Sequence, residues 1–207
     1  MQPAKVSYQR ELEGFLAQKG LDDASRAVDV FHAVRNLAYG RRGGREPAAV
    51  IAHNEGSCSG KHTLLRDALR HLKQTATVET VKGDFAAAIP SHPTMSPALQ
   101  EFCEEGGITD FHQYVVWESP KGEIKLDATW PDELIEKGLP GNRDWDGQGD
   151  TVLALKPEAT LDRAENIAEY KSRLLGGLTQ TQRARRERFL DLLTEWVATT
   201  KCEGAVL

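Results

Sequence analysis

The chain has 207 residues, enough for one domain with a substantial hydrophobic core. Hydrophobic residues make up 40% and charged residues 28%, so the composition excludes a disordered chain. The formal net charge of −5 at pH 7 argues against a nucleic-acid-binding protein, because such proteins normally carry an excess of basic residues.

The N-terminal third of the chain is predicted to be helical. Apolar residues spaced three to four apart predict amphipathic helices over residues 7–19 and from residue 22 or 23 to residue 38. An acidic pair at the start of the second helix suits the positive end of its dipole. A third helix is expected to begin at Ser57 or Cys58 and to run to about residue 73, with Ser57 as its N-cap.

The middle of the chain is predicted to form strands. β-branched residues alternate over residues 75–81 and indicate one strand. Residues 83–107 read as irregular, with a short helix near residues 97–104. The sequence FHQYVVWESPKGEIKLDATWP then places two strand-like runs on either side of Ser-Pro-Lys-Gly, which predicts a β-hairpin.

The last third of the chain is predicted to return to helices. Residues 130–150 are rich in loop-forming residues, and residues 151–155 are expected to form one more strand. Helices are expected over residues 161–175 and 180–199, and the run RARRER within the second is interpreted as a solvated helix face. The order of helices, then strands, then helices favours the α+β class.

The sequence GSCSGKHTLL admits two interpretations. Its Gly-Lys pair suggests a phosphate-binding loop, but that motif requires glycine where Glu55 stands and serine or threonine where His62 stands. Its cysteine suggests a nucleophile, because the pKa of a thiol falls at a helix N-terminus. Gly56 and Gly60 would leave the backbone around Cys58 open to a substrate. The residues therefore favour a cysteine nucleophile over a phosphate-binding loop.

The predicted hairpin supplies a base and an acceptor for such a nucleophile. His112 and Asp127 should lie on its two strands, level within a residue or two. Cross-strand neighbours are about 5 Å apart. At that separation an aspartate accepts a hydrogen bond from an imidazole and fixes its tautomer. Cys58, His112 and Asp127 are therefore the candidate catalytic residues.

Three motifs occur in order along the chain: GSCSGKHTLLRDAL, FHQYVVWE and EIKLDATWP. Together with VFHAVRNLAYGRRGG upstream, they resemble the transglutaminase-like cysteine enzyme superfamily over about residues 25–132. The resemblance implies a papain-like core in which a cysteine-bearing helix packs on an antiparallel sheet. We expect residues 1–207 to form a single domain, with extra helices at both termini, a core of about residues 22–155 and a helical extension over about residues 158–200.

The resemblance also implies roles for the candidate residues. Cys58 would be the nucleophile, His112 the general base and then acid, and Asp127 the residue that orients His112. A thioester would form and would be resolved by water or by an amine. The implied activity is amide hydrolysis or transglutaminase-type acyl transfer on a peptide, protein or small amide, with no cofactor.

Further site residues are suggested by their position in the sequence relative to Cys58 and Asp127. The backbone N–H of Cys58 should meet the oxyanion together with a second donor, for which Asn54 is the candidate. His62 lies one helical turn after Cys58 and is interpreted as a supporting or structural residue. The loop after the aspartate offers three substrate-cleft candidates, Trp130, Arg143 and Trp145. Alternatively, the two tryptophans would only fill the edge of the core.

Two alternatives to an enzyme stay open. The chain could be a catalytically silent binding or scaffolding domain, although a scaffold has no physical need for Cys, His and Asp together. It could also be a metal-binding protein that uses Cys58, His62 and His53. Zinc requires three or four ligands and no closely spaced cysteine pair is present, so we expect no metal.

The cysteines and the apolar runs predict a cytoplasmic protein. Three cysteines are an odd number and make no disulfide framework, which fits a reducing compartment. Cys103 and Cys202 have no partner motif. The first residues lack the apolar segment of a signal peptide, and no apolar run approaches the ~20 residues that span a bilayer. We expect neither a membrane nor a nucleic acid as partner.

Overall fold

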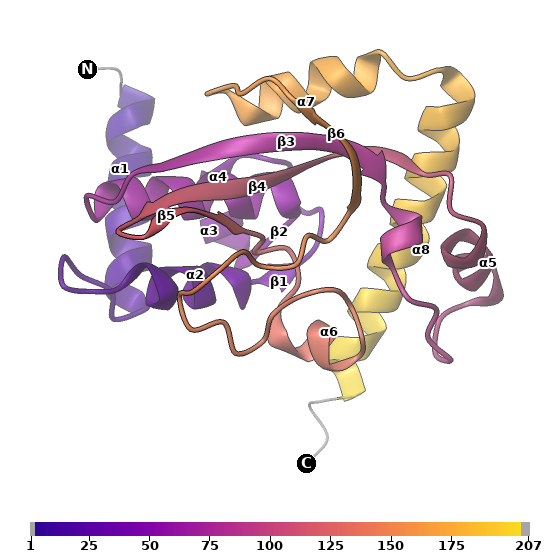
Figure 1. Cartoon of the computed structure of the whole chain (residues 1–207), viewed down its shortest axis with the longest axis horizontal. Helices are drawn as coiled ribbons and strands as arrows, with labels where there is room; N and C mark the ends of the chain where they lie inside the picture. The colour runs from indigo at the N-terminus through magenta and orange to yellow at the C-terminus, as the bar shows by residue number, and fades with distance from the viewer. Residues whose placement is uncertain (1–2, 204–207) are drawn as a thin grey trace.

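The computed structural model describes residues 3–203, with side chains described for residues 7–199. Within this part of the chain, eight α-helices accompany a four-stranded antiparallel sheet and a two-stranded parallel ladder, which confirms the α+β class (Figure 1). None of these helices is both long and apolar enough to cross a bilayer. The helices are α1 (Pro3–Gln18), α2 (Ala27–Arg35), α3 (Pro47–His53), α4 (Cys58–His71), α5 (Pro97–Glu105), α6 (Asp132–Glu136), α7 (Ile167–Gly176) and α8 (Gln180–Glu203).

The four-stranded sheet has the order β5-β4-β3-β6. Its two central strands, β3 (Ala76–Asp84) and β4 (Thr109–Ser119), form the longest ladder. β4 turns directly into β5 (Gly122–Leu126), with Ser119 opposite Gly122. The predicted hairpin is therefore confirmed. The two-residue strands β1 (Ala38–Tyr39) and β2 (Glu55–Gly56) pair in parallel as a separate ladder, and β6 (Lys156–Leu161) forms the far edge of the main sheet.

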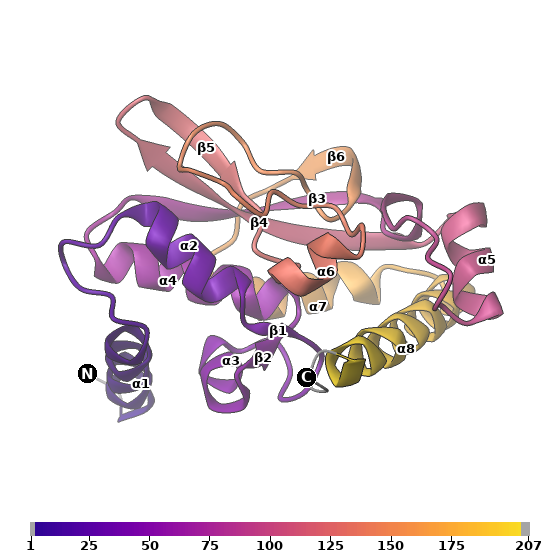
Figure 2. The same ribbon diagram turned by 90° about the horizontal axis from the view of Figure 1, so that it is seen from below.

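Helix α4 packs against β3 and β4 and carries the first core cluster. Its leucines at positions 64, 65 and 69 are fully buried. They meet Val78 on β3 and Val115 on β4, together with α1 and α2. Figure 2 shows α2 and α4 as a layer along the sheet. Burial of this apolar face stabilises the helix. The same packing sets the position of the start of α4 relative to the sheet.

A second core cluster joins the far end of the sheet to the C-terminal helices. Phe189 and Leu193 of α8 pack with Val81 and Phe85 from β3 and its continuation. β6 is itself a strand of the main sheet. Residues after 155 are thus part of the same packed body as residues 22–155, and the expected helical extension starts with a strand.

Several element boundaries differ from the sequence prediction. The second helix begins at Ala27 rather than at residue 22 or 23, because the Asp22 carboxylate accepts a hydrogen bond from the backbone N–H of Ala24 and closes a turn instead. Residues 151–155 form no strand. The strand lies at 156–161, so the helix expected from residue 161 begins at Ile167. Helices α3 and α6 were not predicted.

Candidate functional site

The cysteine-bearing helix begins at the predicted residue. Cys58 is the first residue of α4 and Ser57 is its N-cap, although the Ser57 side chain makes no capping hydrogen bond. The glycines on either side have a different role from the one predicted. A Cβ at Gly56 or at Gly60 would lie 2.7 Å from a methyl carbon of Val50. They let the start of α4 approach α3 closely, rather than leaving space for a substrate.

The lysine of the Gly-Lys pair anchors the backbone around this helix start. Lys61 is fully buried, and its Nζ donates to the carbonyl oxygens of Arg35 at 2.7 Å, Leu37 at 2.9 Å and Thr129 at 2.9 Å. The ammonium therefore joins the end of α2 and the segment after β5 to α4. This is a structural role, in agreement with the rejection of a phosphate-binding loop.

Replacing Lys61 with methionine is expected to destabilise the fold by about 3 kcal/mol, because three buried carbonyl oxygens lose their donor. Urea denaturation followed by circular dichroism measures the change. Lys121→Met, at an exposed position in the β4–β5 turn, is the matched control and should change stability by less than about 0.5 kcal/mol. Equal stability of the two variants would contradict this role of Lys61.

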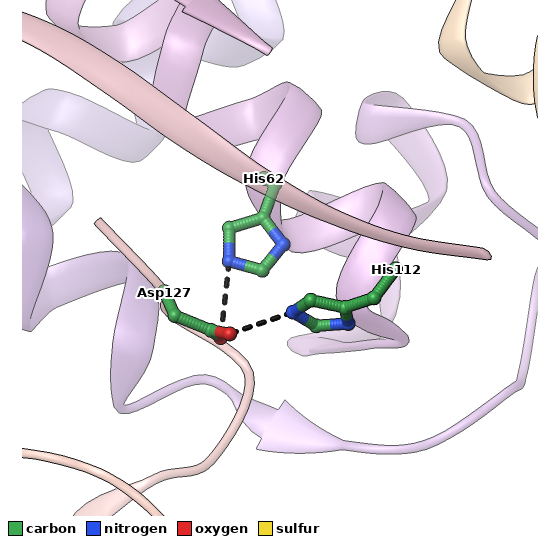
Figure 3. A group of neighbouring side chains, drawn as sticks. All are labelled: His62, His112 and Asp127. Atoms are coloured by element: carbon green, nitrogen blue, oxygen red, sulfur yellow. Dashed lines mark hydrogen bonds and ion pairs between the residues drawn. The ribbon is translucent and has the colours of Figure 1, made fainter. Parts of the chain in front are cut away.

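His112 and Asp127 meet as predicted from the hairpin. The strand register pairs Val115 with Leu126, so Asp127 immediately follows the end of β5 while His112 lies on β4. Nε2 of His112 is 2.6 Å from Oδ2 of Asp127, and both side chains are buried (Figure 3). Because an ionised carboxylate only accepts hydrogen bonds, Nε2 carries the proton, and Nδ1 is the nitrogen left to interact with the thiol.

The carboxylate of Asp127 is held by backbone groups as well as by His112. Its Oδ1 accepts from the N–H of Thr129 at 3.0 Å, and its Oδ2 accepts from the N–H of Ala154 at 2.7 Å. The N–H of Asp127 donates to Oγ1 of Thr151 at 2.6 Å. The segment that was predicted as a strand therefore has another role, because it fixes the orientation of Asp127.

His62 connects the cysteine-bearing helix to the same aspartate segment. Its Nε2 is 2.7 Å from the backbone nitrogen of Ala128 and 3.4 Å from Oδ1 of Asp127 (Figure 3). A backbone N–H only donates, so Nε2 of His62 must accept, and the ring is the neutral Nδ1–H tautomer. The contact with Asp127 is then a close packing contact rather than an ion pair. The interpretation of His62 as a supporting residue agrees with this geometry.

The ionisation of the site favours a thiolate beside an imidazolium. Burial raises the pKa of Cys58, but the Lys171 ammonium and a hydrogen bond with the His112 ring outweigh it and lower that pKa to about 5. Burial lowers the pKa of His112, but the Asp127 carboxylate raises it to about 10. The pKa of Asp127 is held well below its usual range, because His112 outweighs the effect of burial.

A second group of buried charges also contacts the sulfur. Nζ of Lys171 is 3.6 Å from Sγ of Cys58 and 3.5 Å from Oδ1 of Asp110. Asp110 in turn accepts from Arg186 at 3.0 and 3.2 Å. Arg186 is 5% exposed, so the expected solvated face of RARRER is wrong at this residue. The charges alternate in sign along one chain of contacts: Asp127, His112, Cys58, Lys171, Asp110 and Arg186.

This alternation explains how six ionisable groups are buried together. Each cation touches at least one anion, and the set as a whole is neutral when Cys58 is a thiolate. Burial raises the pKa of Asp110, but Lys171 and Arg186 outweigh it and lower that pKa to about 2. Lys171 and Asp110 were not among the predicted site residues. Asp110 precedes His112 by two residues on one strand, a spacing that places both on one face.

A cavity of about 500 Å³ opens beside Cys58. Its wall combines the segment after β1, the start of α4, α7 and α8. The cavity is therefore lined by residues from both the expected core (about residues 22–155) and the expected helical extension (about residues 158–200). This shared lining was not predicted from the sequence. Six of the lining residues are Tyr39, Phe85, Cys58, Asp110, Lys171 and Arg186.

Of the proposed site residues, Cys58 alone is among the described residues that line this cavity, and four of the others have a different place in the fold. Asn54 ends α3 in the left-handed conformation, with φ of 50°, and lines a different depression beside Pro131. Trp145 is buried in the first core cluster, and Arg143 pairs with Glu136 at 2.6 Å. Trp130 packs behind the lining residues Tyr39 and Phe85, so it supports the wall without forming it. The second oxyanion donor must come from elsewhere.

The side chains close enough together to bind a metal ion differ from the expected set of Cys58, His62 and His53. Among the described side chains, the group with metal-binding proximity is His62, His112 and Asp127, and neither Cys58 nor His53 belongs to it. The lone pair on Nε2 of His62 is already engaged by the Ala128 N–H, and Nε2 of His112 carries a proton for Asp127. These donors fit one another better than they fit a cation. Cys202 lies outside the described side chains.

A scan against protein-family models and a search of curated proteins find no match to the sequence. The resemblance to transglutaminase-like enzymes therefore rests on the three motifs and on the spacing of their residues.

Proposed function

We propose that the protein is a cysteine-dependent acyl-transfer enzyme of the transglutaminase-like type, with a papain-like core. The observation that carries the proposal is the pairing of His112 with Asp127 at 2.6 Å, next to a helix-terminal thiol whose pKa is lowered to about 5. A thiolate formed at neutral pH beside an oriented imidazolium is the arrangement that nucleophilic catalysis by cysteine requires.

The proposed reaction divides between three residues. The thiolate of Cys58 attacks an acyl carbon, the S–C bond forms, and the carbonyl electron pair moves to the oxygen. The pair then returns, the C–N bond breaks, and His112 gives its proton to the leaving amine. His112 next takes a proton from water, which cleaves the thioester and regenerates the thiolate. Asp127 keeps the His112 ring in the required tautomer throughout.

The substrate we propose is an amide in a peptide, a protein or a small molecule, and hydrolysis is the favoured outcome. A cavity of about 500 Å³ next to the sulfur supports a substrate that inserts one residue-sized acyl group. The enzyme would act in the cytoplasm, where reducing conditions keep Cys58 as a free thiol.

The direct test is to trap the acyl-enzyme with an activated ester. Incubation with p-nitrophenyl acetate should release one rapid equivalent of p-nitrophenolate and leave one acetyl group on the peptide that contains Cys58. Neutral hydroxylamine should remove that group, as expected of a thioester. Adding a primary alkyl amine separates the two activities, because an amine transferase would form the N-alkyl acetamide while a hydrolase would form acetate.

Three results would contradict the proposal. Acetylation of lysines with none on Cys58 would exclude a reactive nucleophile. Stoichiometric zinc in the purified protein, lost in Cys58→Ala, would favour the metal-binding alternative instead. A protein that binds peptides without becoming acylated would point to the scaffolding alternative.

The pH dependence of amide cleavage is expected to be bell-shaped. The nucleophile is the deprotonated thiol, so the rate should fall as pH decreases through the Cys58 pKa of about 5. The acid is the protonated imidazole, so the rate should fall as pH increases through the His112 pKa of about 10. Initial rates measured on a chromogenic amide between pH 4 and pH 11 test this. A maximum confined to pH 8–9 would indicate an ordinary thiol and contradict the lowered pKa.

A further inference from the structure

Lys171 contacts the reacting atom directly. Its Nζ is 3.6 Å from Sγ of Cys58, the residue is 2% exposed, and it lines the cavity where a substrate would enter. Helix α7 brings it there by packing against both α4 and β4. The mechanism proposed above uses Cys58, His112 and Asp127, and so far it assigns Lys171 no part in the chemical step.

The position of this ammonium is fixed by the charges behind it. Asp110 lies 3.5 Å from Nζ and is held by Arg186 and by the N–H of Phe111 at 2.7 Å. Lys171 donates one N–H to Cys58 and forms an ion pair with Asp110. Within the part of the chain that the structure describes, no third contact is found, and the cavity adjoins the side chain. A cation that is already oriented needs no reorganisation when negative charge develops next to it.

The charge of the nucleophile moves only a short way during attack. When the S–C bond forms, the negative charge passes from sulfur to the oxygen attached to the same carbon. That oxygen is two bonds from Sγ. An ammonium in contact with the sulfur therefore stays within reach of the oxyanion, whereas Asn54 lines a different depression.

We propose that Lys171 is the second oxyanion donor of this site, acting with the backbone N–H of Cys58. The first N–H groups of a helix lack intrahelical acceptors, so the Cys58 N–H supplies one donor. The Lys171 ammonium supplies the other, and it also stabilises the thiolate before attack. This inference rests on the proposed acyl-transfer function.

The test compares two reactions of the same sulfur. Alkylation by iodoacetamide uses the thiolate but forms no oxyanion, whereas acylation by p-nitrophenyl acetate uses the thiolate and forms one. The leaving p-nitrophenolate needs no proton, so His112 does not complicate the comparison. Both rates are measured from pH 4 to pH 9 in the wild type, in Lys171→Met and in Lys121→Met, a control at an exposed turn position.

The two reactions should respond differently to Lys171→Met. The alkylation midpoint should move to higher pH because the thiolate loses a cation, but its plateau at high pH should stay within about threefold of the wild type. The acylation plateau should fall by about 100-fold, the effect of removing one oxyanion donor. Lys121→Met should match the wild type in both. Equal loss in the two plateaus, or no loss in either, would overturn the assignment.

Two further outcomes have defined meanings. If Lys171→Met fails to fold, Lys171→Arg keeps the buried positive charge but moves the donor atoms, and its acylation plateau should still fall about tenfold more than its alkylation plateau. Parallel plateaus in this variant would equally overturn the assignment. A wild type that is alkylated but never acylated would instead show that the proposed function itself is wrong.

Discussion

Cys58→Ala is expected to abolish acyl transfer, with a loss of about 10⁵-fold in kcat/KM for a chromogenic ester or amide. No other group in the cavity can form the thioester, because the other described cysteine, Cys103, lies on α5 outside the cavity. The measurement is the initial rate at pH 7, together with a circular dichroism spectrum to confirm that the fold is retained. Cys103→Ala is the matched control and should keep the wild-type rate.

Cys58→Ser provides a second comparison at the same position. The hydroxyl is close in size to the thiol but stays neutral at pH 7. The variant therefore lacks the negative charge that the sulfur provides next to Lys171 and His112. Its activity should be as low as that of the alanine variant. Activity retained in either variant would show that another residue carries the reaction, and would remove the basis for the proposed site.

Asp127→Asn is expected to reduce acyl transfer by about 10³- to 10⁴-fold. Both carboxylate oxygens now accept hydrogen bonds, from His112 and Ala154 on one side and from Thr129 on the other. An amide offers only one accepting oxygen, so its NH₂ must face one of these donors. Loss of the charge also lowers the pKa of His112, and a less basic ring stabilises the Cys58 thiolate less.

The same variant is expected to affect both catalysis and stability. Three quantities should decrease together: the initial rate, the rate of iodoacetamide labelling of Cys58 at pH 6, and the free energy of unfolding measured in urea. The reason is that one side chain orients His112 and also holds the backbone at residue 154. Asp146→Asn, at an exposed loop position, is the control and should change none of the three. A variant with reduced stability but normal rates would contradict the role given to Asp127.

Local sequence patterns pointed to the residues at the centre of the candidate site. Cys58 begins a helix whose apolar face is dense, and His112 and Asp127 are brought together by a hairpin that spans few residues. Their proximity follows from turn position and register, which are properties of a short segment. For the same reason the α+β class and the antiparallel hairpin could be predicted.

Long-range docking decided the residues that could not be predicted. Lys171 reaches Cys58 only because α7 packs against α4 and β4 from more than a hundred residues away, and no local pattern encodes that contact. Asn54 was chosen by closeness in sequence, but at the end of α3 it lines a different depression. Arg186 was expected to be solvated because it lies in a run of basic residues, but in the fold it pairs with the buried Asp110.

The most direct test of the central claim is competitive labelling of two cysteines in one sample at pH 6. The pKa of Cys58 is lowered to about 5, whereas burial raises that of Cys103 to about 11. A limiting amount of iodoacetamide, followed by peptide mass spectrometry, should label Cys58 at least 100-fold faster than Cys103. Equal, slow labelling of both cysteines would show that Cys58 is an ordinary buried thiol and would contradict the proposed nucleophile.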